Sequence, residues 1–170
     1  MISLQTPICK ICLKSGILCQ SCSQKLQEGK ISKLELDISL ALFELSKKHK
    51  ELDQLIFKRA VDSDGLVILV VGPGQIPLLV GRKGRIVQEL ENILKSKVRI
   101  VEEGSTEKKL IQDLLTPADV LGINILYTKS GDEYRIRVPR QHMKRLPKNK
   151  EKLEAALSKL TNKNYTIIFE

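Results

Sequence analysis

An internal repeat constrains the fold of this 170-residue chain more than any other feature of its sequence. Shifting the sequence by 67 residues without a gap superposes the apolar positions of two segments, one in each half. The superposed pairs include Val67 with Tyr134, Leu69 with Ile136, Val71 with Val138, Leu90 with Leu157 and Ile100 with Ile167. Agreement at one offset over three elements predicts a tandem duplication. The alternative is one irregular α+β domain with coincidental periodicity.

Each half contains the same order of predicted elements. In the first half, Ser32 to Glu35 reads as a capping box before a helix to residue 48. Strands are expected over 54–61, 66–71 and 97–102, with a short apolar segment at 75–80 and a helix after Gly84. The second half predicts a helix over 106–115, a hairpin of 122–128 with 133–138, a helix over 149–160 and a strand over 164–169. The pattern α-β-β-α-α-β therefore places the chain in the α+β class. Strand 66–71 is apolar at every position, which predicts that both its faces are covered.

All four cysteines lie near the N-terminus, in the pattern C-x2-C-x6-C-x2-C formed by Cys9, Cys12, Cys19 and Cys22. Two such pairs on tight turns complete a tetrahedron of thiolates around one Zn²⁺. Four protein ligands leave no open position, so we expect one structural zinc ion and no metal catalysis there. The alternatives are two disulfides, an iron–sulfur cluster or free thiols. A polar stretch, residues 23–31, follows the predicted zinc module.

A glycine-bounded loop, Gly81-Arg82-Lys83-Gly84, separates two apolar helical segments. The glycines allow a sharp turn and the close approach of a backbone ligand. Since a helix begins here, its free N–H groups should face the loop, where Arg82, Lys83 and Arg85 can meet phosphates. KH modules hold about four nucleotides of RNA with a GxxG loop in this position. We therefore predict a single-stranded RNA site here, with Ile76 as part of its wall, against the alternative of an ordinary glycine turn.

The second half lacks this loop, because the shift of 67 residues places Lys148-Asn149-Lys150-Glu151 at the same position. It is nevertheless basic: residues 129–163 hold eleven Lys or Arg and four Asp or Glu, a net charge of +7. Alternation along the strand predicts that Arg135 and Arg137 face away from the core. The candidate basic track for an RNA backbone consists of Arg135, Arg137, Arg140, Lys144, Arg145 and Lys148. The alternative is a solvated basic surface.

The composition of the chain narrows the kinds of partner that it can bind. The net charge of +9 indicates a polyanionic partner, whereas six aromatic residues, none of them Trp, are too few for a base-stacking platform. No apolar run is long enough for a membrane span, and the N-terminus does not resemble a secretory signal. We therefore expect a cytoplasmic protein without a membrane partner.

Catalytic motifs are absent from the sequence, so we predict that the chain is not an enzyme. No cysteine lies outside the predicted metal cluster, and His49 and His142 are expected to be solvated. The glycines around Pro73 do not make a dinucleotide fingerprint, because Pro77 stands where that motif needs glycine.

The segments 80–90 and 97–102 resemble the first KH domain of the NusA family, and Leu114 to Val120 looks like the link between the family's two KH domains. The resemblance is to the small archaeal NusA-like proteins with two type II KH domains, and it covers about residues 33–170. It implies a role for Gly81, Arg82, Lys83 and Gly84 in RNA binding. It also implies contact with nascent RNA and RNA polymerase during transcription elongation and termination.

The sequence thus predicts three parts: residues 1–31 as a zinc module and linker, 32–104 as a first KH domain, and 105–170 as a degenerate second KH domain. The missing second GxxG and the added zinc module depart from the family pattern. Two alternatives therefore stay open for the function. One is a ribosome-associated or rRNA-binding protein that meets a ribosomal subunit, and the other is a protein–protein adaptor that uses the zinc module and the second repeat.

Overall fold

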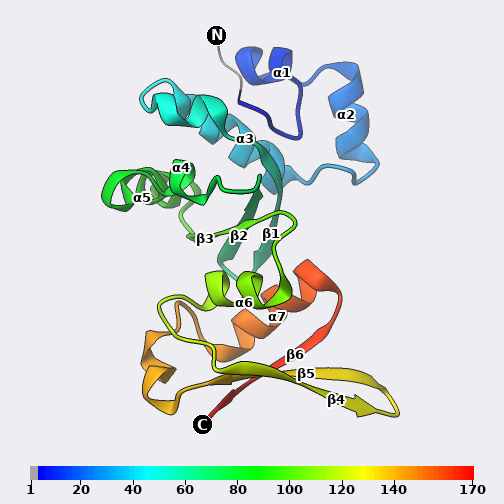
Figure 1. Ribbon diagram of the computed structural model, residues 1–170. Helices are drawn as coiled ribbons and strands as arrows, with labels where there is room; N and C mark the ends of the chain where they lie inside the picture. Colours follow the sequence, from blue (N-terminus) through cyan, green and yellow to red (C-terminus); the bar gives the residue numbers. More distant parts are fainter. Residues whose placement is uncertain (1–3) are drawn as a thin grey trace. The chain divides into compact units, whose positions relative to one another are not determined.

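The computed structural model describes residues 4–170 (Figure 1). It is an α+β structure with two three-stranded sheets and a four-cysteine cluster near the N-terminus. The described residues group into two compact units. The first holds the chain up to Ala60 together with Leu69–Glu103, and the second holds Val61–Ile68 together with Gly104–Glu170.

Two short helices, α1 (Lys10–Ser15) and α2 (Gln20–Gln27), carry the cysteines. The polar stretch that follows the cysteines is helical over residues 23–27, which belong to α2. The physical reason is capping, since Cys19 is the N-cap of α2 and its Sγ accepts a hydrogen bond from the Cys22 N–H. Gly16, with a φ of 75°, ends α1 in the left-handed region that favours glycine.

The first unit is built from alternating helical and extended segments around the sheet of β1, β2 and β3. In chain order they are α3 (Lys33–Ser46), η1 (Lys50–Gln54), β1 (Phe57–Ser63), β2 (Leu66–Val71), α4 (Ile76–Val80), η2 (Arg82–Gly84), α5 (Arg85–Leu94) and β3 (Lys97–Glu102). The end of β1 and the start of β2, within Val61–Ile68, are grouped with the second unit. Strand β2 is central in the sheet order β1-β2-β3. Helix α5 packs against α3, α4 and β3.

The burial of β2 agrees with the prediction from sequence, whereas the start of β1 does not. All six residues of β2 are buried, so both faces of the strand are covered, as predicted. The strand expected over 54–61 instead starts at Phe57. The preceding residues form the 3-10 turn η1, which puts Leu52 and Leu55 fully into the core. A run of apolar residues alone does not separate such a turn from a strand.

The second unit repeats the order in a shorter form. Its elements are α6 (Glu107–Leu115), β4 (Gly122–Thr128), β5 (Gly131–Val138), η3 (Arg140–Arg145), α7 (Lys150–Thr161) and β6 (Asn164–Phe169). Strand β5 lies between antiparallel β4 and parallel β6. Helices α6 and α7 lie on the same side of this sheet (Figure 1).

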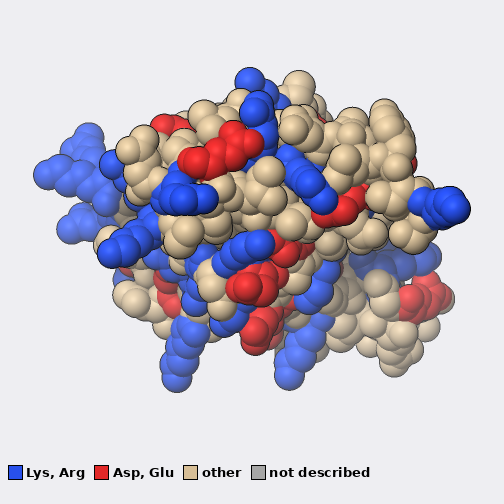
Figure 2. All heavy atoms as spheres, turned by 90° about the horizontal axis from the view of Figure 1, so that it is seen from below, with Lys and Arg blue, Asp and Glu red and all other residues tan. Residues whose placement is uncertain are grey.

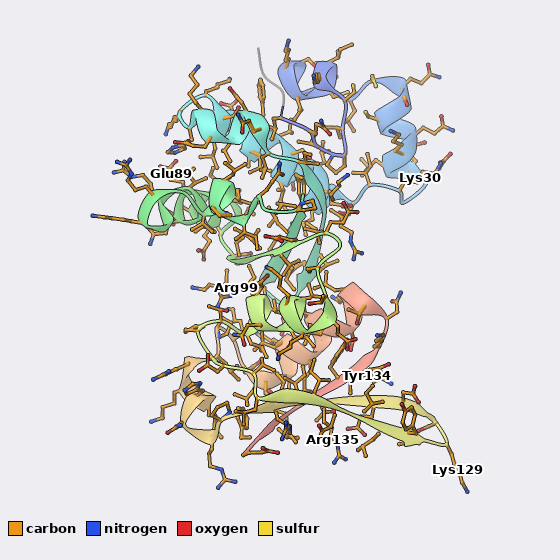
Figure 3. All side chains as sticks on the ribbon, viewed as in Figure 1. Lys30, Glu89, Arg99, Lys129, Tyr134 and Arg135 are labelled. Atoms are coloured by element: carbon orange, nitrogen blue, oxygen red, sulfur yellow. The ribbon has the colours of Figure 1, made fainter. Side chains whose placement is uncertain are left out.

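Alternation along β5 gives this sheet two different faces. Ile136 and Val138 are fully buried, whereas Arg135 points away from the helices and Tyr134 towards them (Figure 3). Arg137 is on the same face as Arg135 but is half-buried, because its guanidinium lies over Gly122 of β4. Among the helices of residues 4–170, none has the length and apolar character to cross a membrane.

Candidate metal centre and nucleic-acid interface

The four cysteine sulfurs lie together as the sequence predicted. Their Sγ atoms are all within 4.8 Å of one another, and Cys9 Sγ lies 3.4 Å from Cys12 Sγ and 3.9 Å from Cys19 Sγ. Zinc–sulfur bonds of about 2.3 Å in a tetrahedron separate neighbouring sulfurs by about 3.8 Å. No disulfide bond joins these cysteines, so all four sulfurs are available as ligands. The cluster has the size and the donors of a four-thiolate metal site.

Backbone N–H groups point at three of these sulfurs. The N–H of Cys9 donates to Cys22 Sγ at 3.5 Å, that of Cys19 to Cys12 Sγ at 3.1 Å, and that of Cys22 to Cys19 Sγ at 3.4 Å. Such donors stabilise negative charge on sulfur and fix the side chains before a metal arrives. The short helices α1 and α2 therefore serve to aim the thiols.

The surroundings lower the pKa of two of the thiols and raise the pKa of the other two. Hydrogen bonding from the Cys22 N–H lowers the pKa of Cys19 to about 7, and a backbone N–H likewise lowers the pKa of Cys9. Burial raises the pKa of Cys12 to about 12 and also raises the pKa of Cys22. Cys9 and Cys19 thus form thiolates more easily than the buried Cys12 and Cys22 do. Thiolates are the metal-binding form of cysteine.

The backbone of the glycine-bounded loop is unusual. Gly81, Lys83 and Gly84 all have positive φ, at 77°, 56° and 74°. A left-handed conformation at a residue other than glycine costs roughly 1–2 kcal/mol, so Lys83 is held in a strained conformation. Residues 148–151, the corresponding segment of the second unit, contain no positive φ, and Asn149 caps α7 instead. The special loop conformation is therefore confined to the first unit.

The loop presents positive charge at an uncapped helix end. Gly84 is the N-cap of α5 and supplies no side-chain cap, and the first turn of α5 contains no acidic residue. Arg82, Lys83 and Arg85 are exposed, and together with Gln88 they line a hollow of about 360 Å³. Free helix N–H groups beside three cations are suited to bind phosphate.

The apolar side chains near the loop divide between core and surface. Ile76 is half-buried, so part of its side chain remains available for contact. Leu79 and Ile86 are 0% and 2% exposed, which makes them core residues. Ile86 also faces Arg82 and Arg85 at the edge of a second hollow of about 290 Å³, which includes His49 and Glu51.

The basic residues of the second half are not all free. Arg135 lies 3.5 Å from Glu133 Oε1, Arg137 Nη1 lies 3.6 Å from Glu170 Oε2, and Arg145 Nη1 lies 3.1 Å from His142 Nε2. Arg140 and Lys144 are exposed, and Lys148 is half-buried. On the face drawn in Figure 2, lysine and arginine side chains are separated by acidic and uncharged ones.

Both histidines differ from the sequence prediction, which expected them to be solvated. His49 is mostly buried and its Nε2 lies 3.2 Å from Glu89 Oε2 of α5. His142 is 8% exposed, and its Nδ1 accepts a hydrogen bond from the backbone N–H of Asp119. Both contacts join segments far apart in sequence, so no local pattern could have predicted them.

The sequence reasoning also missed residues close to the two hollows. His49 and Glu51 line the second hollow with Arg82, and Gln88 lines the first. Gln88 could have been found from its position, because residue 88 lies one helical turn after Arg85 and faces the same side. His49 and Glu51 could not, because they reach the loop through the fold of η1.

Comparisons with known proteins support the fold. No family model and no curated protein matches the chain. Among solved structures, one described as "Crystal structure of APE1850" superposes with a TM-score of 0.55 at 21% sequence identity. The match covers 74% of this chain and 94% of that chain. At this identity the likeness concerns the fold alone.

Proposed function

We propose that this chain is a non-catalytic RNA-binding protein with two type II KH domains behind a zinc module. The element order of both units and the order β4-β5-β6, with β5 antiparallel to one neighbour and parallel to the other, support the KH arrangement. The first unit would hold single-stranded RNA, and the second would extend the surface through Arg135, Arg140, Lys144, Arg145 and Lys148. Zn²⁺ is the metal that we propose for the four cysteines, because a closed four-thiolate site is typical of structural zinc.

One observation carries the proposal: the left-handed loop from Gly81 to Gly84 at the uncapped end of α5. Its backbone gives a phosphate close access to helix N–H groups, and Arg82, Lys83 and Arg85 supply the opposite charge. Arg137 is less suited to this surface, because its guanidinium lies over Gly122.

A charge-reversal pair tests the loop. We expect Arg82→Asp with Lys83→Asp to weaken binding of a labelled random 12-nucleotide RNA by at least about tenfold near 0.1 M salt. The dependence of affinity on salt should also become shallower by about 0.7 per lost phosphate contact. Fluorescence anisotropy over a salt series measures both effects.

Lys33→Asp with Lys48→Asp is the matched control, because Lys33 at the start of α3 and Lys48 just beyond its end are both exposed and the net charge changes equally. Equal weakening by the two pairs would mean that RNA responds only to total charge, and would contradict the loop as the RNA site.

We further propose that the RNA is nascent transcript during elongation or termination, following the resemblance to NusA. Native protein from gently lysed cells should then sediment with RNA polymerase in a density gradient. Sedimentation with a ribosomal subunit would contradict this assignment and leave rRNA as the ligand.

A further inference from the structure

Strand β4 forms an unprotected edge of the second sheet. The strand order β4-β5-β6 leaves one side of β4 without a neighbour among the described residues. Its sequence, Gly-Ile-Asn-Ile-Leu-Tyr-Thr, has no charged residue and no proline. Edge strands in stable proteins usually carry such residues to prevent pairing with other chains. The backbone N–H and C=O groups on the outer side of β4 are therefore ready to accept another strand.

Apolar side chains accompany this edge. Tyr127 is 80% exposed and Ile125 is 45% exposed, although both lie on the face of β4 opposite to the open face of the sheet. Leu121 and Leu126 are exposed as well, at 51% and 36%. The β4–β5 hairpin continues to Thr128 and Gly131, whereas β6 pairs with β5 only from Glu133 onwards. The hairpin end, with Lys129 at its tip in Figure 3, thus exposes its apolar side chains where the sheet narrows to two strands.

Arg137 brings an incompletely paired positive charge over the same strand. Gly122 lies opposite Arg137 in the register, and a Cβ at Gly122 would lie 2.7 Å from Arg137 Nη2. The guanidinium therefore crosses β4 where there is no side chain. Its Nε is buried and has no hydrogen-bond partner within residues 4–170, and the approach of its Nη1 to Glu170 is long, at 3.6 Å. An arginine in this state favours an added carboxylate, since charge-assisted pairs with arginine are strong and often bidentate.

We propose that the outer edge of β4 binds an extended, acidic segment of a partner protein by strand addition. Main-chain hydrogen bonds to β4 would supply affinity, apolar side chains of the segment would cover Ile125 and Tyr127, and a carboxylate would pair with Arg137. This surface goes beyond the proposed RNA-binding function and uses a different part of the chain.

Charge favours an acidic protein segment as the partner of β4 over RNA and over a second copy of this chain. RNA would meet only Arg137 along this edge, because the seven residues of β4 supply no cation of their own. A second copy of the chain would bring its own β4, which has no carboxylate for Arg137. An acidic partner also fits the unit as a whole, because residues 104–170 hold thirteen Lys or Arg against eight Asp or Glu, a net charge of +5.

The test uses the full chain and a labelled, end-capped peptide, Glu-Val-Glu-Val-Glu-Val-Glu, followed by fluorescence anisotropy. Saturable binding is expected, together with slower hydrogen exchange of amides in residues 122–128. Arg137→Gln should weaken binding at least fivefold, and so should Tyr127→Thr, which keeps a strand-forming residue in place of an exposed ring. Circular dichroism of each variant checks that the fold is retained.

Lys108→Gln is the matched control, since it removes one positive charge from an exposed position on α6. The same peptide with Lys in place of Glu should not bind. The proposal is overturned if Lys108→Gln weakens binding as much as Arg137→Gln does, if protection appears at residues 81–84 instead of β4, or if neither β4-edge variant has an effect. A concentration-dependent dimer in sedimentation that Tyr127→Thr abolishes would assign the edge to a second copy and equally overturn it. Because Arg82 and Lys83 are unchanged in these variants, failure here leaves the RNA proposal to its own test.

Discussion

At Gly81 the backbone φ is 77°, and an added Cβ would lie 2.6 Å from Ile86 Cγ1. Ile86 is buried at the start of α5 and cannot move without disturbing the core. The left-handed turn and the close contact both require glycine. This residue therefore fixes where the basic side chains of the loop stand relative to the helix.

We expect Gly81→Ala to lower the free energy of unfolding by about 2–4 kcal/mol, from backbone strain together with overpacking against Ile86. Gly74→Ala is the matched control, because Gly74 has almost the same φ, at 74°, with nothing within 4 Å of its added Cβ. That variant should cost only about 1–2 kcal/mol, the strain alone. Urea unfolding followed by circular dichroism measures both, and equal losses would show that Ile86 yields freely.

At the scale of elements, Glu35 joins helix α3 to strand β1. Its Oε1 accepts from the Ser32 N–H at 2.9 Å and completes the capping box, while its Oε2 accepts from the Ala60 N–H at 3.2 Å. The side chain is 9% exposed, so both backbone donors depend on it for a partner. Glu35, which the sequence predicted as part of a capping box, thus also holds α3 against β1.

Glu35→Ala should destabilise the protein by about 2–4 kcal/mol, because it leaves two shielded N–H groups without acceptors. Glu35→Gln retains one acceptor oxygen and should lie between wild type and Glu35→Ala. Glu44→Ala on the same helix removes an exposed carboxylate and should change the stability by no more than about 0.5 kcal/mol. A similar loss for Glu44→Ala and Glu35→Ala in thermal unfolding would contradict this assignment.

Local patterns predicted most of these elements. Strands β2, β3, β4 and β6 have the bounds that alternation and turn residues indicated. The capping box at Ser32 and the grouping of the cysteines are confirmed as well. These features depend on residues close together in the chain, where propensity and spacing carry the information.

The features that sequence reasoning missed depend on contacts between distant segments. The position of Arg137 over Gly122 needs the register of β4 with β5, and the burial of His142 needs the Asp119 N–H. Helices α1 and α2 are too short for periodicity to predict, and the first turn of α2 is capped by the side chain of Cys19.

At the scale of the whole molecule, the cysteine module is part of the first unit and is held in it by more than the linker. Gln5 pairs with Ile56 in a parallel bridge, in which the Gln5 N–H donates to Leu55 O at 3.0 Å and the Phe57 N–H donates to Gln5 O at 2.8 Å. Leu4 and Ile8 are buried, and α1 packs on α3. The module therefore has an anchor that does not involve its sulfurs.

Chelation should release one metal ion per chain and unfold α1 and α2 without unfolding the rest. The two helices are too short to be stable without the tetrahedral cross-link, whereas the sheets have cores of their own. Hydrogen exchange should therefore accelerate over residues 10–27 and stay slow over 164–169, and added Zn²⁺ should restore protection. Release of no metal, or loss of protection in β6, would contradict a local structural role.

The cluster is open to solvent on one side, because Cys9 is exposed while Cys12 and Cys22 are buried and Cys19 is intermediate. An incoming thiol or chelator can approach a bound ion only from that side, where it would displace the Cys9 sulfur first. We therefore expect removal of a bound ion by a chelator to begin at the Cys9 sulfur.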